Sequence, residues 1–293
     1  MTEGRSKMLQ NKYDFVYLFD VTNGNPNGDP DAGNEPRVDA ETGIGYVTDV
    51  CLKRKVRNYV DLVKDGAEGY NILIKNDKPL NDKFKAAYEA EGLETDVTKK
   101  GTNLPVELKA QKFMCRNYYD VRTFGAVMST GKNSCGIVRG PVQFSFADSI
   151  SPIAINNVTI TRQAKTDEAR AAKGDTEMGT KNIVPYALYR MSGHISAALA
   201  NKVTGLSEDD VELLWQALLN MFDEDRSAAR GDMEVRGLYV FKHDNILGNA
   251  RFPELDRKIA VNLKDGIVVP RRFEDYEVTV NRDLPDGVTL IAY

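Results

Sequence analysis

The 293-residue sequence contains few of the side chains that bind transition metals or form crosslinks. It has three cysteines, Cys51, Cys115 and Cys135, and two histidines, His194 and His243. The cysteines lie far apart without CxxC spacing, which argues against a disulfide framework and against a zinc site. We therefore expect no metal and no cofactor.

Long hydrophobic runs are also absent. No apolar stretch reaches the length that spans a membrane, and Met1–Lys12 is polar, without the apolar segment of a signal peptide. We therefore expect a cytoplasmic protein that does not bind a membrane. Excess positive charge is missing too: the net charge is -4, so the overall charge does not indicate a nucleic-acid-binding protein.

Turn-forming residues are concentrated between Asp20 and Arg37, in the segment DVTNGNPNGDPDAGNEPR. Its Asn-Gly pairs place residues that adopt positive φ beside prolines, whose φ is fixed. This predicts an irregular loop that contains neither helix nor strand. The preceding residues Tyr13–Val21 are apolar on both faces, which is typical of a buried central strand.

A basic helix is predicted after this loop, with Thr48 as its N-cap. Its apolar residues recur at helical spacing, at Leu52, Val56, Tyr59, Val60 and Val63. This spacing leaves Lys53, Arg54 and Arg57 toward solvent. The loop adds three amide side chains, Asn23, Asn25 and Asn27. Together these donors suit a phosphate group, although an ordinary solvated basic face is the alternative.

The residues Asp120–Met128 are predicted to form a second core strand. Arg122 on this strand is a candidate phosphate or base contact, and Gly125 allows a close approach of the backbone. The alternative is a surface arginine that pairs with Asp120. Between the basic helix and this strand, residues 65–119 predict a small helical insertion. It comprises a short strand at Tyr70–Lys75 and helices at Asn81–Glu91 and Leu104–Tyr119.

A third strand is predicted at Val138–Ile150, where apolar and polar residues alternate. We interpret the apolar side, with Val142, Phe144 and Phe146, as core and not as a surface on which bases stack. Gln143 lies on the other side.

A hairpin arm is predicted after this strand. Asn157–Arg162 is rich in β-branched residues, residues 163–181 are polar, and Ile183–Ile195 reads as a strand again. A segment with so few apolar residues cannot bury itself. The arm should therefore project and leave Met178 and Lys181 exposed.

The C-terminal third predicts a helix from Ser207, a strand at Leu238–Phe241, and a final hairpin of Tyr276–Asn281 with Val288–Tyr293. The core order is then strand, basic helix, insertion, strand, arm, strand, helix, strand. This is the βαββαβ order of the ferredoxin-like or RNA-recognition (RRM-like) topology, an α+β fold, with two insertions. Without internal repeats or linkers, the chain reads as one domain.

Several of these segments together resemble a known family. They are Phe19–Pro30, Val47–Arg57, Asp120–Gly125, Gly140–Ile150 and Gly179–Lys181. The chain resembles the repeated backbone subunit of type I CRISPR Cascade complexes, a member of the RAMP superfamily, of the type I-C and I-B kind. The resemblance covers nearly the whole chain.

The resemblance implies a hand-shaped protein. Its palm would comprise about residues 12–64, 120–161 and 184–293, its helical fingers residues 65–119, and its β-hairpin thumb residues 162–183. Such a subunit is a non-catalytic scaffold that polymerises along a CRISPR guide RNA, grips the RNA backbone and presents the bases for pairing with target DNA in antiviral defence. The implied partners are the guide RNA, target DNA, further copies of the chain, and the guide-end-capping, large and small Cascade subunits.

The resemblance also suggests roles for individual residues. The expected RNA-binding residues are Asn23, Asn25, Asn27, Arg37, Lys53, Arg54, Arg57, Arg122, Phe124, Gly125, Arg139 and Gln143. Met178 and Lys181 would form the wedge of the thumb that displaces a base. Arg139 and Gln143 follow from strand position and not from a matched motif.

Two enzymatic alternatives remain. Related backbone subunits of type III complexes cut RNA with a loop aspartate, so a metal-dependent endoribonuclease could use Asp29, Asp31 or Asp39. A small-molecule enzyme could instead use Cys135 or His194 as a nucleophile.

Overall fold

A computed structural model of the chain describes residues 8–94, 104–162 and 177–293. Its strands are β1 (Tyr13–Gly24), β2 (Gly28–Asp29), β3 (Glu35–Pro36), β4 (Ile44–Val47), β5 (Gly125–Met128), β6 (Gly136–Arg139), β7 (Val142–Phe144), β8 (Ala147–Pro152), β9 (Asn156–Arg162), β10 (Glu177–Ile195), β11 (Asp232–His243), β12 (Ile259–Leu263), β13 (Tyr276–Val280) and β14 (Val288–Ala292). Its helices are η1 (Pro30–Ala32), α1 (Asp49–Lys64), α2 (Leu80–Ala90), α3 (Leu104–Asn117), α4 (Tyr119–Phe124), α6 (Ala197–Leu199), η2 (Ala200–Thr204), α7 (Glu208–Glu224), α8 (Phe252–Asp256) and η3 (Phe273–Asp275). Within these described ranges, no helix is both long enough and apolar enough to cross a membrane.

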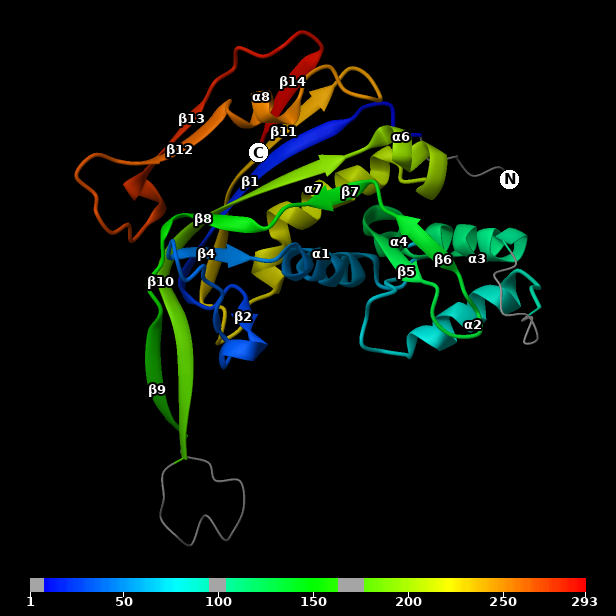
Figure 1. The fold of residues 1–293 in the computed structure, drawn as a ribbon, viewed down its shortest axis with the longest axis horizontal. Helices are drawn as coiled ribbons and strands as arrows, with labels where there is room; N and C mark the ends of the chain where they lie inside the picture. Colours follow the sequence, from blue (N-terminus) through cyan, green and yellow to red (C-terminus); the bar gives the residue numbers. More distant parts are fainter. Residues whose placement is uncertain (1–7, 95–103, 163–176) are drawn as a thin grey trace, which may run out of the picture.

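One large antiparallel sheet forms the centre of the molecule, in the order β14-β11-β1-β10-β8-β4, with β7 and β9 also paired to β10 (Figure 1). The mixed α/β composition is confirmed. Strand β1 lies inside the sheet, as predicted, and continues beyond Val21 to Gly24. Phe15 and Tyr17 face one hydrophobic core, and Val16 and Leu18 face a second core on the other side.

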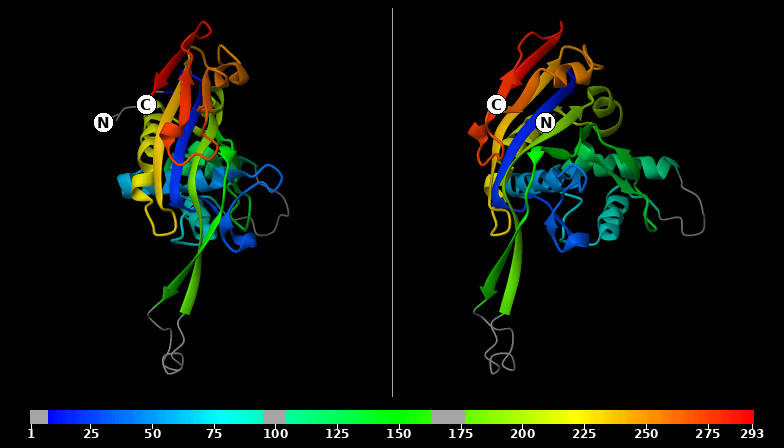
Figure 2. Two further views of the ribbon diagram at one scale, coloured as in Figure 1. Left: turned by 90° about the vertical axis from the view of Figure 1, so that its left-hand side faces the viewer. Right: turned by 60° about the vertical axis from the view of Figure 1, so that its left-hand side comes forward.

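Helices α1 and α7 cover the first face of the sheet. Trp215 of α7 packs edge-on against Phe15, with ring centroids 5.1 Å apart. Helix α7 begins with the predicted Ser207 cap, reinforced by a reciprocal hydrogen bond with Asp210. The opposite face is covered by α8 and the β12–β13 hairpin (Figure 2).

Strand β10 extends beyond the sheet to form the arm hairpin, which we define as β9 paired with Glu177–Ile183 of β10. Because β10 is continuous, the arm is an extension of a core strand, and it projects away from the rest of the molecule (Figure 1). Met178 is 75% exposed, as predicted. Lys181 was also predicted to be exposed, but it is half-buried and donates to the carbonyl of Ala228. The rest of the predicted arm, residues 163–176, lies outside the described residues.

Helices α2 and α3 and the β5–β6 hairpin pack around a separate hydrophobic cluster. We call this part of the molecule the side unit. Phe84, Met114, Met128 and Val138 are among its buried residues. The two predicted helices are present. The packing extends past residue 119, however, because β5 and β6 belong to the same cluster.

Two strand predictions in this region need correction. Of the predicted strand Asp120–Met128, residues 120–124 belong to helix α4, and only Gly125–Met128 is a strand, β5. Tyr70–Lys75 is irregular: the N–H groups of Leu73 and Ile74 donate to the Asp120 carboxylate instead of to a neighbouring strand.

Three more predictions need correction. The strand Val138–Ile150 is divided into β6, β7 and β8, and the first break contains Pro141, which has no N–H to donate. Tyr276–Asn281 and Val288–Tyr293 do not pair with each other, because β13 pairs with β12 and β14 pairs with β11. The loop 20–37 contains the short β2–β3 pair and η1.

Replacing Leu52 tests how α1 packs on the sheet. Leu52 is fully buried, so Leu52→Ala should lower the free energy of unfolding by about 2–5 kcal/mol, because apolar contacts are lost and a cavity remains. Val50 on the same helix is 66% exposed, so Val50→Ala should change it by less than about 0.5 kcal/mol. Denaturant titration measures both, and similar losses would contradict this packing.

Candidate nucleic-acid interface

A groove of about 550 Å³ lies where the loop 20–37 meets the start of α1. Its lining comes from four parts of the chain: the loop, α1, the β7–β8 connection and the segment between α7 and β11. The residues that matter for its chemistry are Asn27, Arg37, Thr48, Arg54, Lys55, Phe146, Asp225 and Arg230.

The asparagines of the loop mostly maintain its shape. The Asn27 side-chain oxygen accepts hydrogen bonds from the backbone N–H and the hydroxyl of Thr48, both at 3.0 Å. Asn25 is buried and donates to the carbonyl of Asn34. Asn23 has the positive φ expected of the loop, at 51°, and is exposed. Of the three, Asn27 lines the groove, and its amide also ties the loop to the N-terminus of α1.

Arginines supply the positive charge of the groove. Arg54 is exposed, and within the described part of the chain it forms no ion pair. Arg37 lies 3.2 Å from the Asp29 carboxylate. Two carboxylates also line the groove, and both are paired: Asp225 with Arg230 and the buried Lys55, and Asp49 with Lys53. Guanidinium groups that meet a helix N-terminus in this way suit an anionic ligand.

Other predicted residues lie outside this groove. Lys53 pairs with Asp49 at 2.8 Å and lies over the rings of Phe124 and Phe144, 5.6 and 5.9 Å from their centroids. Arg139 and Gln143 are exposed on β6 and β7. The Gln143 amide donates to the carbonyl of Gly140.

The predicted solvent exposure of Arg57 is wrong. Its Nε donates to the buried carboxylate of Asp120 at 2.8 Å, so α1 directs this cation toward the side unit. Val63, expected to face inward, is 49% exposed instead.

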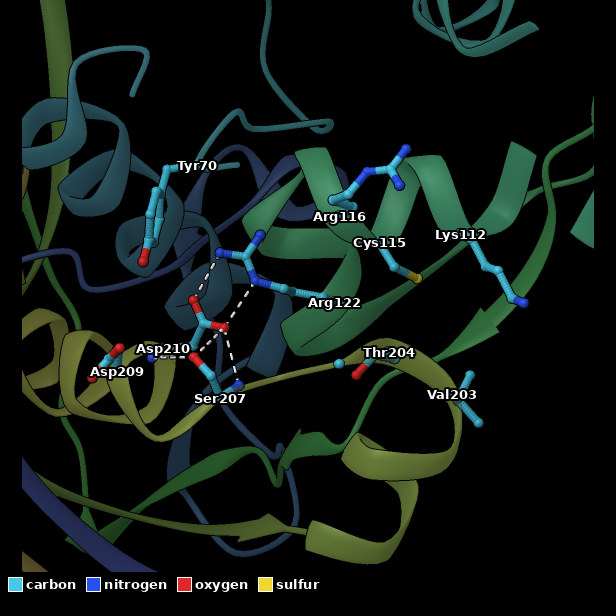
Figure 3. Close-up of a pocket in the computed structure, with 11 residues that line it drawn as sticks. Tyr70, Lys112, Cys115, Arg116, Arg122, Val203, Thr204, Ser207, Asp209 and Asp210 are labelled. Carbon is cyan, nitrogen blue, oxygen red and sulfur yellow. Dashed lines mark hydrogen bonds and ion pairs between the residues drawn. The ribbon is translucent and has the colours of Figure 1, made fainter. Parts of the chain in front are cut away.

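Arg122 is also buried, so the alternative of a surface arginine that pairs with Asp120 is wrong. Arg122 forms two hydrogen bonds with the Asp210 carboxylate, at 2.9 and 2.7 Å, and a third with the carbonyl of Gly69. Figure 3 shows this pair at the edge of a second pocket, of about 440 Å³, between the side unit and the start of α7. The guanidinium therefore binds a partner within the chain.

Phe124 and Gly125 also serve internal packing. Phe124 is buried against Phe144. Gly125 has a φ of 79°, and a Cβ there would lie 2.3 Å from the carbonyl oxygen of Val138. The close backbone approach that we predicted is therefore an approach to β6 of the same chain.

Asp29 and Cys135, two of the residues proposed for enzymatic roles, are paired or buried within the chain. Asp29 pairs with Arg37 and accepts a hydrogen bond from the N–H of Asp31. Among residues 8–94, 104–162 and 177–293, no three His, Cys, Asp or Glu side chains are grouped so as to hold a metal ion. Burial, followed by the nearby Glu107, raises the pKa of Cys135 to about 12, which disfavours the nucleophilic thiolate.

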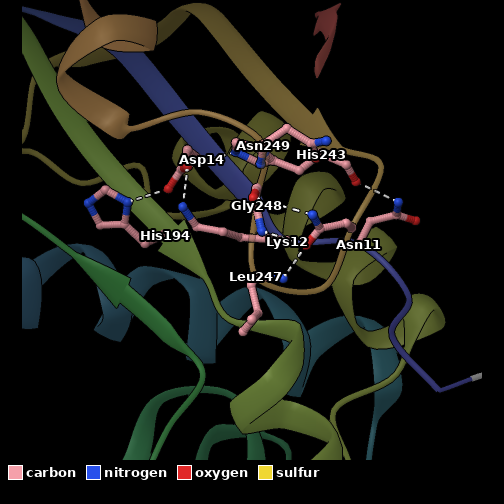
Figure 4. A network of polar contacts seen from close by, with 9 residues as sticks. Asn11, Lys12, Asp14, His194, His243, Leu247, Gly248 and Asn249 are labelled. Atoms are coloured by element: carbon pink, nitrogen blue, oxygen red, sulfur yellow. Dashed lines mark hydrogen bonds and ion pairs between the residues drawn. The ribbon is translucent and has the colours of Figure 1, made fainter. Parts of the chain in front are cut away.

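His194 belongs to a network centred on Asp14 (Figure 4). Its Nδ1 lies 2.6 Å from the Asp14 carboxylate, His243 Nε2 lies 2.9 Å from it, and the Lys12 ammonium lies 2.8 Å from it. His243 Nδ1 accepts from the N–H of Asn249, so Nε2 carries the proton toward Asp14. The network joins β1, β10 and β11, which indicates a structural role for His194.

Comparison with known proteins identifies the family. The family model for CRISPR-associated protein Cas7 matches residues 11–281. The chain belongs to the Cas7 family. It is 29% identical over 237 residues to a CRISPR-associated protein Cas7 of Haloferax volcanii, and the match covers 72% of this chain and 65% of the length of that relative.

Solved structures similar to this Cas7 chain include two from RNA-guided complexes. A chain of a "CRISPR RNA-guided surveillance complex, pre-nicking" has a TM-score of 0.48 and 13% identity, and 78% of each chain is covered. A chain of a "CRISPR RNA-guided surveillance complex" has a TM-score of 0.44 and 11% identity, with 78% of this chain and 68% of that chain covered.

Sequence reasoning missed several residues of the groove in this Cas7 chain, among them Arg230 and Phe146. Arg230 follows the acidic residues 223–225 and precedes Gly231, whose φ is 64°, so a turn at the start of β11 was the available signal. Phe146 was assigned to the core from strand alternation, but it is 50% exposed, so that assignment is wrong. The break between β7 and β8 changes its surroundings.

The Asp14 network predicts a pH-dependent stability. Burial opposes ionisation of Asp14, but hydrogen bonds from His194, His243 and Lys12 outweigh it and hold the pKa of this carboxyl below its usual range. The stabilisation is complete above the unfolded pKa of about 3.9 and is lost as the pH falls toward the lower folded pKa.

We therefore expect Asp14→Asn to lower the free energy of unfolding at pH 5, and the difference from wild type to shrink below about pH 4. Urea titrations at pH 5, 4 and 3 measure it. The exposed Asp286, changed to Asn, is the control and should show little difference at any pH. A constant loss for Asp14→Asn down to pH 3 would contradict the role of its ionised form.

Proposed function

We propose that the chain is a non-catalytic scaffold that polymerises along a CRISPR guide RNA, grips its backbone and presents its bases for pairing with target DNA. The observation that carries the proposal is the groove at the start of α1, where Arg54 lies near Arg37 and Arg230. Arg54 is exposed and has no acidic partner among the residues that the structure describes. These groups can bind phosphate whatever the neighbouring base, as a scaffold for any guide sequence requires.

The fold supports an RRM-like palm. Within the sheet, the order β11-β1-β10-β8 places the first, second, third and fourth core strands in the sequence 4-1-3-2. Helices α1 and α7 follow the first and third of these strands and cover one face. We assign this βαββαβ unit as the palm, the side unit as the fingers, and the arm hairpin as the thumb.

The rest of the assignment follows from family membership and from exposure. Met178, exposed on the arm hairpin, is the candidate wedge that displaces a base. We place the protein in the cytoplasm, in a complex of type I-C. Its partners there are further copies of itself and the guide-end-capping, large and small subunits. Arg57 and Arg122 are assigned to the packing of the fingers and not to RNA, because both pair with buried carboxylates.

Removal of the Arg54 charge tests the groove. Arg54→Ala should weaken RNA binding and reduce the slope of log affinity against log salt by roughly 0.7 per bound subunit, the value for one phosphate contact on a single strand. Fluorescence anisotropy across a salt series measures it. Arg251 is also exposed, but lies at the start of α8 on the opposite face of the sheet, so Arg251→Ala should leave the slope unchanged.

Filament growth is tested with RNAs of increasing length. Longer RNAs should bind more copies in regular steps, and the RNA should be recovered intact after incubation with Mg²⁺. An unchanged slope for Arg54→Ala would show that the groove does not hold the RNA backbone. RNA shortened at regular intervals would contradict the scaffold role and favour the endoribonuclease.

A further inference from the structure

An exposed aromatic pair lies beside the groove. Phe146 is 50% exposed and stacks on Tyr46 of β4, with ring centroids 6.0 Å apart and planes 5° from parallel. The exposed part of this ring offers an apolar aromatic surface to a partner. Its environment indicates what that partner is.

The backbone holds Phe146 in place. The hydroxyl of Ser145 donates to the carbonyl of Phe146 at 2.7 Å and accepts from the N–H of Ser192 on β10 at 3.0 Å. The N–H of Tyr46 donates to the carbonyl of Arg37 at 3.0 Å. The aromatic pair is therefore fixed to the sheet on one side and to an arginine of the groove on the other.

Phe146 stands between two hollows of opposite character. On one side is the groove, where the cations Arg37, Arg54, Lys55 and Arg230 outnumber the carboxylates of Asp49 and Asp225. On the other is a hollow of about 620 Å³ that includes Tyr46, Asp39 and Asp148. A phosphate is attracted to the first and repelled by the carboxylates of the second. A nucleotide bound here would thus place its phosphate on the arginine side and its base over Phe146.

We propose that Phe146, supported by Tyr46, is a stacking surface for one base of the bound RNA, whose phosphate lies against Arg54. The inference rests on the proposed RNA scaffold and extends it to a specific contact. Every base has an aromatic face, so such a contact is independent of sequence. It orients one nucleotide per subunit relative to the gripped backbone.

The test uses the full chain and a short RNA that carries the fluorescent base 2-aminopurine, whose emission is quenched by stacking. Phe146→Ala should weaken binding by about 5-fold to 150-fold per site and restore the emission, whereas Phe146→Trp should retain both affinity and quenching. Phe146→Leu, which keeps an apolar side chain without the ring, should behave as Phe146→Ala. Leu247, 76% exposed, supplies the control Leu247→Ala, with no expected effect.

Two further experiments identify the ligand. On an RNA of the same length without bases, wild type and Phe146→Ala should bind equally, because the contact needs a base. When 2-aminopurine is moved to a complementary DNA strand, Phe146→Ala should not change its emission; a change there would assign the stacked base to DNA and overturn the proposal.

The outcomes separate the two levels of the proposal. If wild type binds no RNA, the scaffold function itself fails. If wild type binds RNA and Arg54→Ala reduces the salt slope, but Phe146→Ala matches wild type in affinity and quenching, the stacking surface alone is overturned.

Discussion

The buried carboxylate of Asp120 is the constraint on which the arrangement of α1 and the side unit depends. It is 1% exposed and accepts hydrogen bonds from the N–H groups of Leu73 and Ile74 and from Arg57. A carboxylate removed from water needs such donors, because an unpaired buried charge is costly. The three donors come from α1 and from the irregular segment before α2, so one side chain joins α1 to the base of the side unit.

This constraint divides the cations of α1 into two groups. Arg57 turns inward to Asp120, and nearby Arg122 turns to Asp210 at the start of α7, so both hold elements together. Arg54, one helical turn earlier, remains exposed in the groove. One helix thus has an internal structural side and a side that is exposed in the groove, although its cations look alike in the sequence.

Local patterns were sufficient where each element's own residues determine it. The buried strand β1, the Thr48 cap of α1 and the Ser207 cap of α7 follow from spacing and capping chemistry within a few residues. The polar composition of the arm likewise predicted that Met178 is exposed.

Contacts between distant residues decided what local patterns could not show. In Tyr70–Lys75, the N–H of Ile74 donates to the side chain of Asp120, 46 residues away, and not to a partner strand. The β-like composition of this segment was therefore misleading. The inward turn of Arg57 required a buried acid on another element. The exposure of Phe146 follows from the break between β7 and β8, which alternation along a single strand does not reveal.

The most direct test of the account is to locate the RNA on the protein. RNA containing 4-thiouridine, bound to the full chain and irradiated, forms covalent adducts that mass spectrometry assigns to residues. The account predicts adducts around Arg37, Arg54 and Phe146. Adducts confined to the second pocket, around Tyr70 and Lys112, would contradict it, because the RNA would then lie where Arg122 is paired with Asp210.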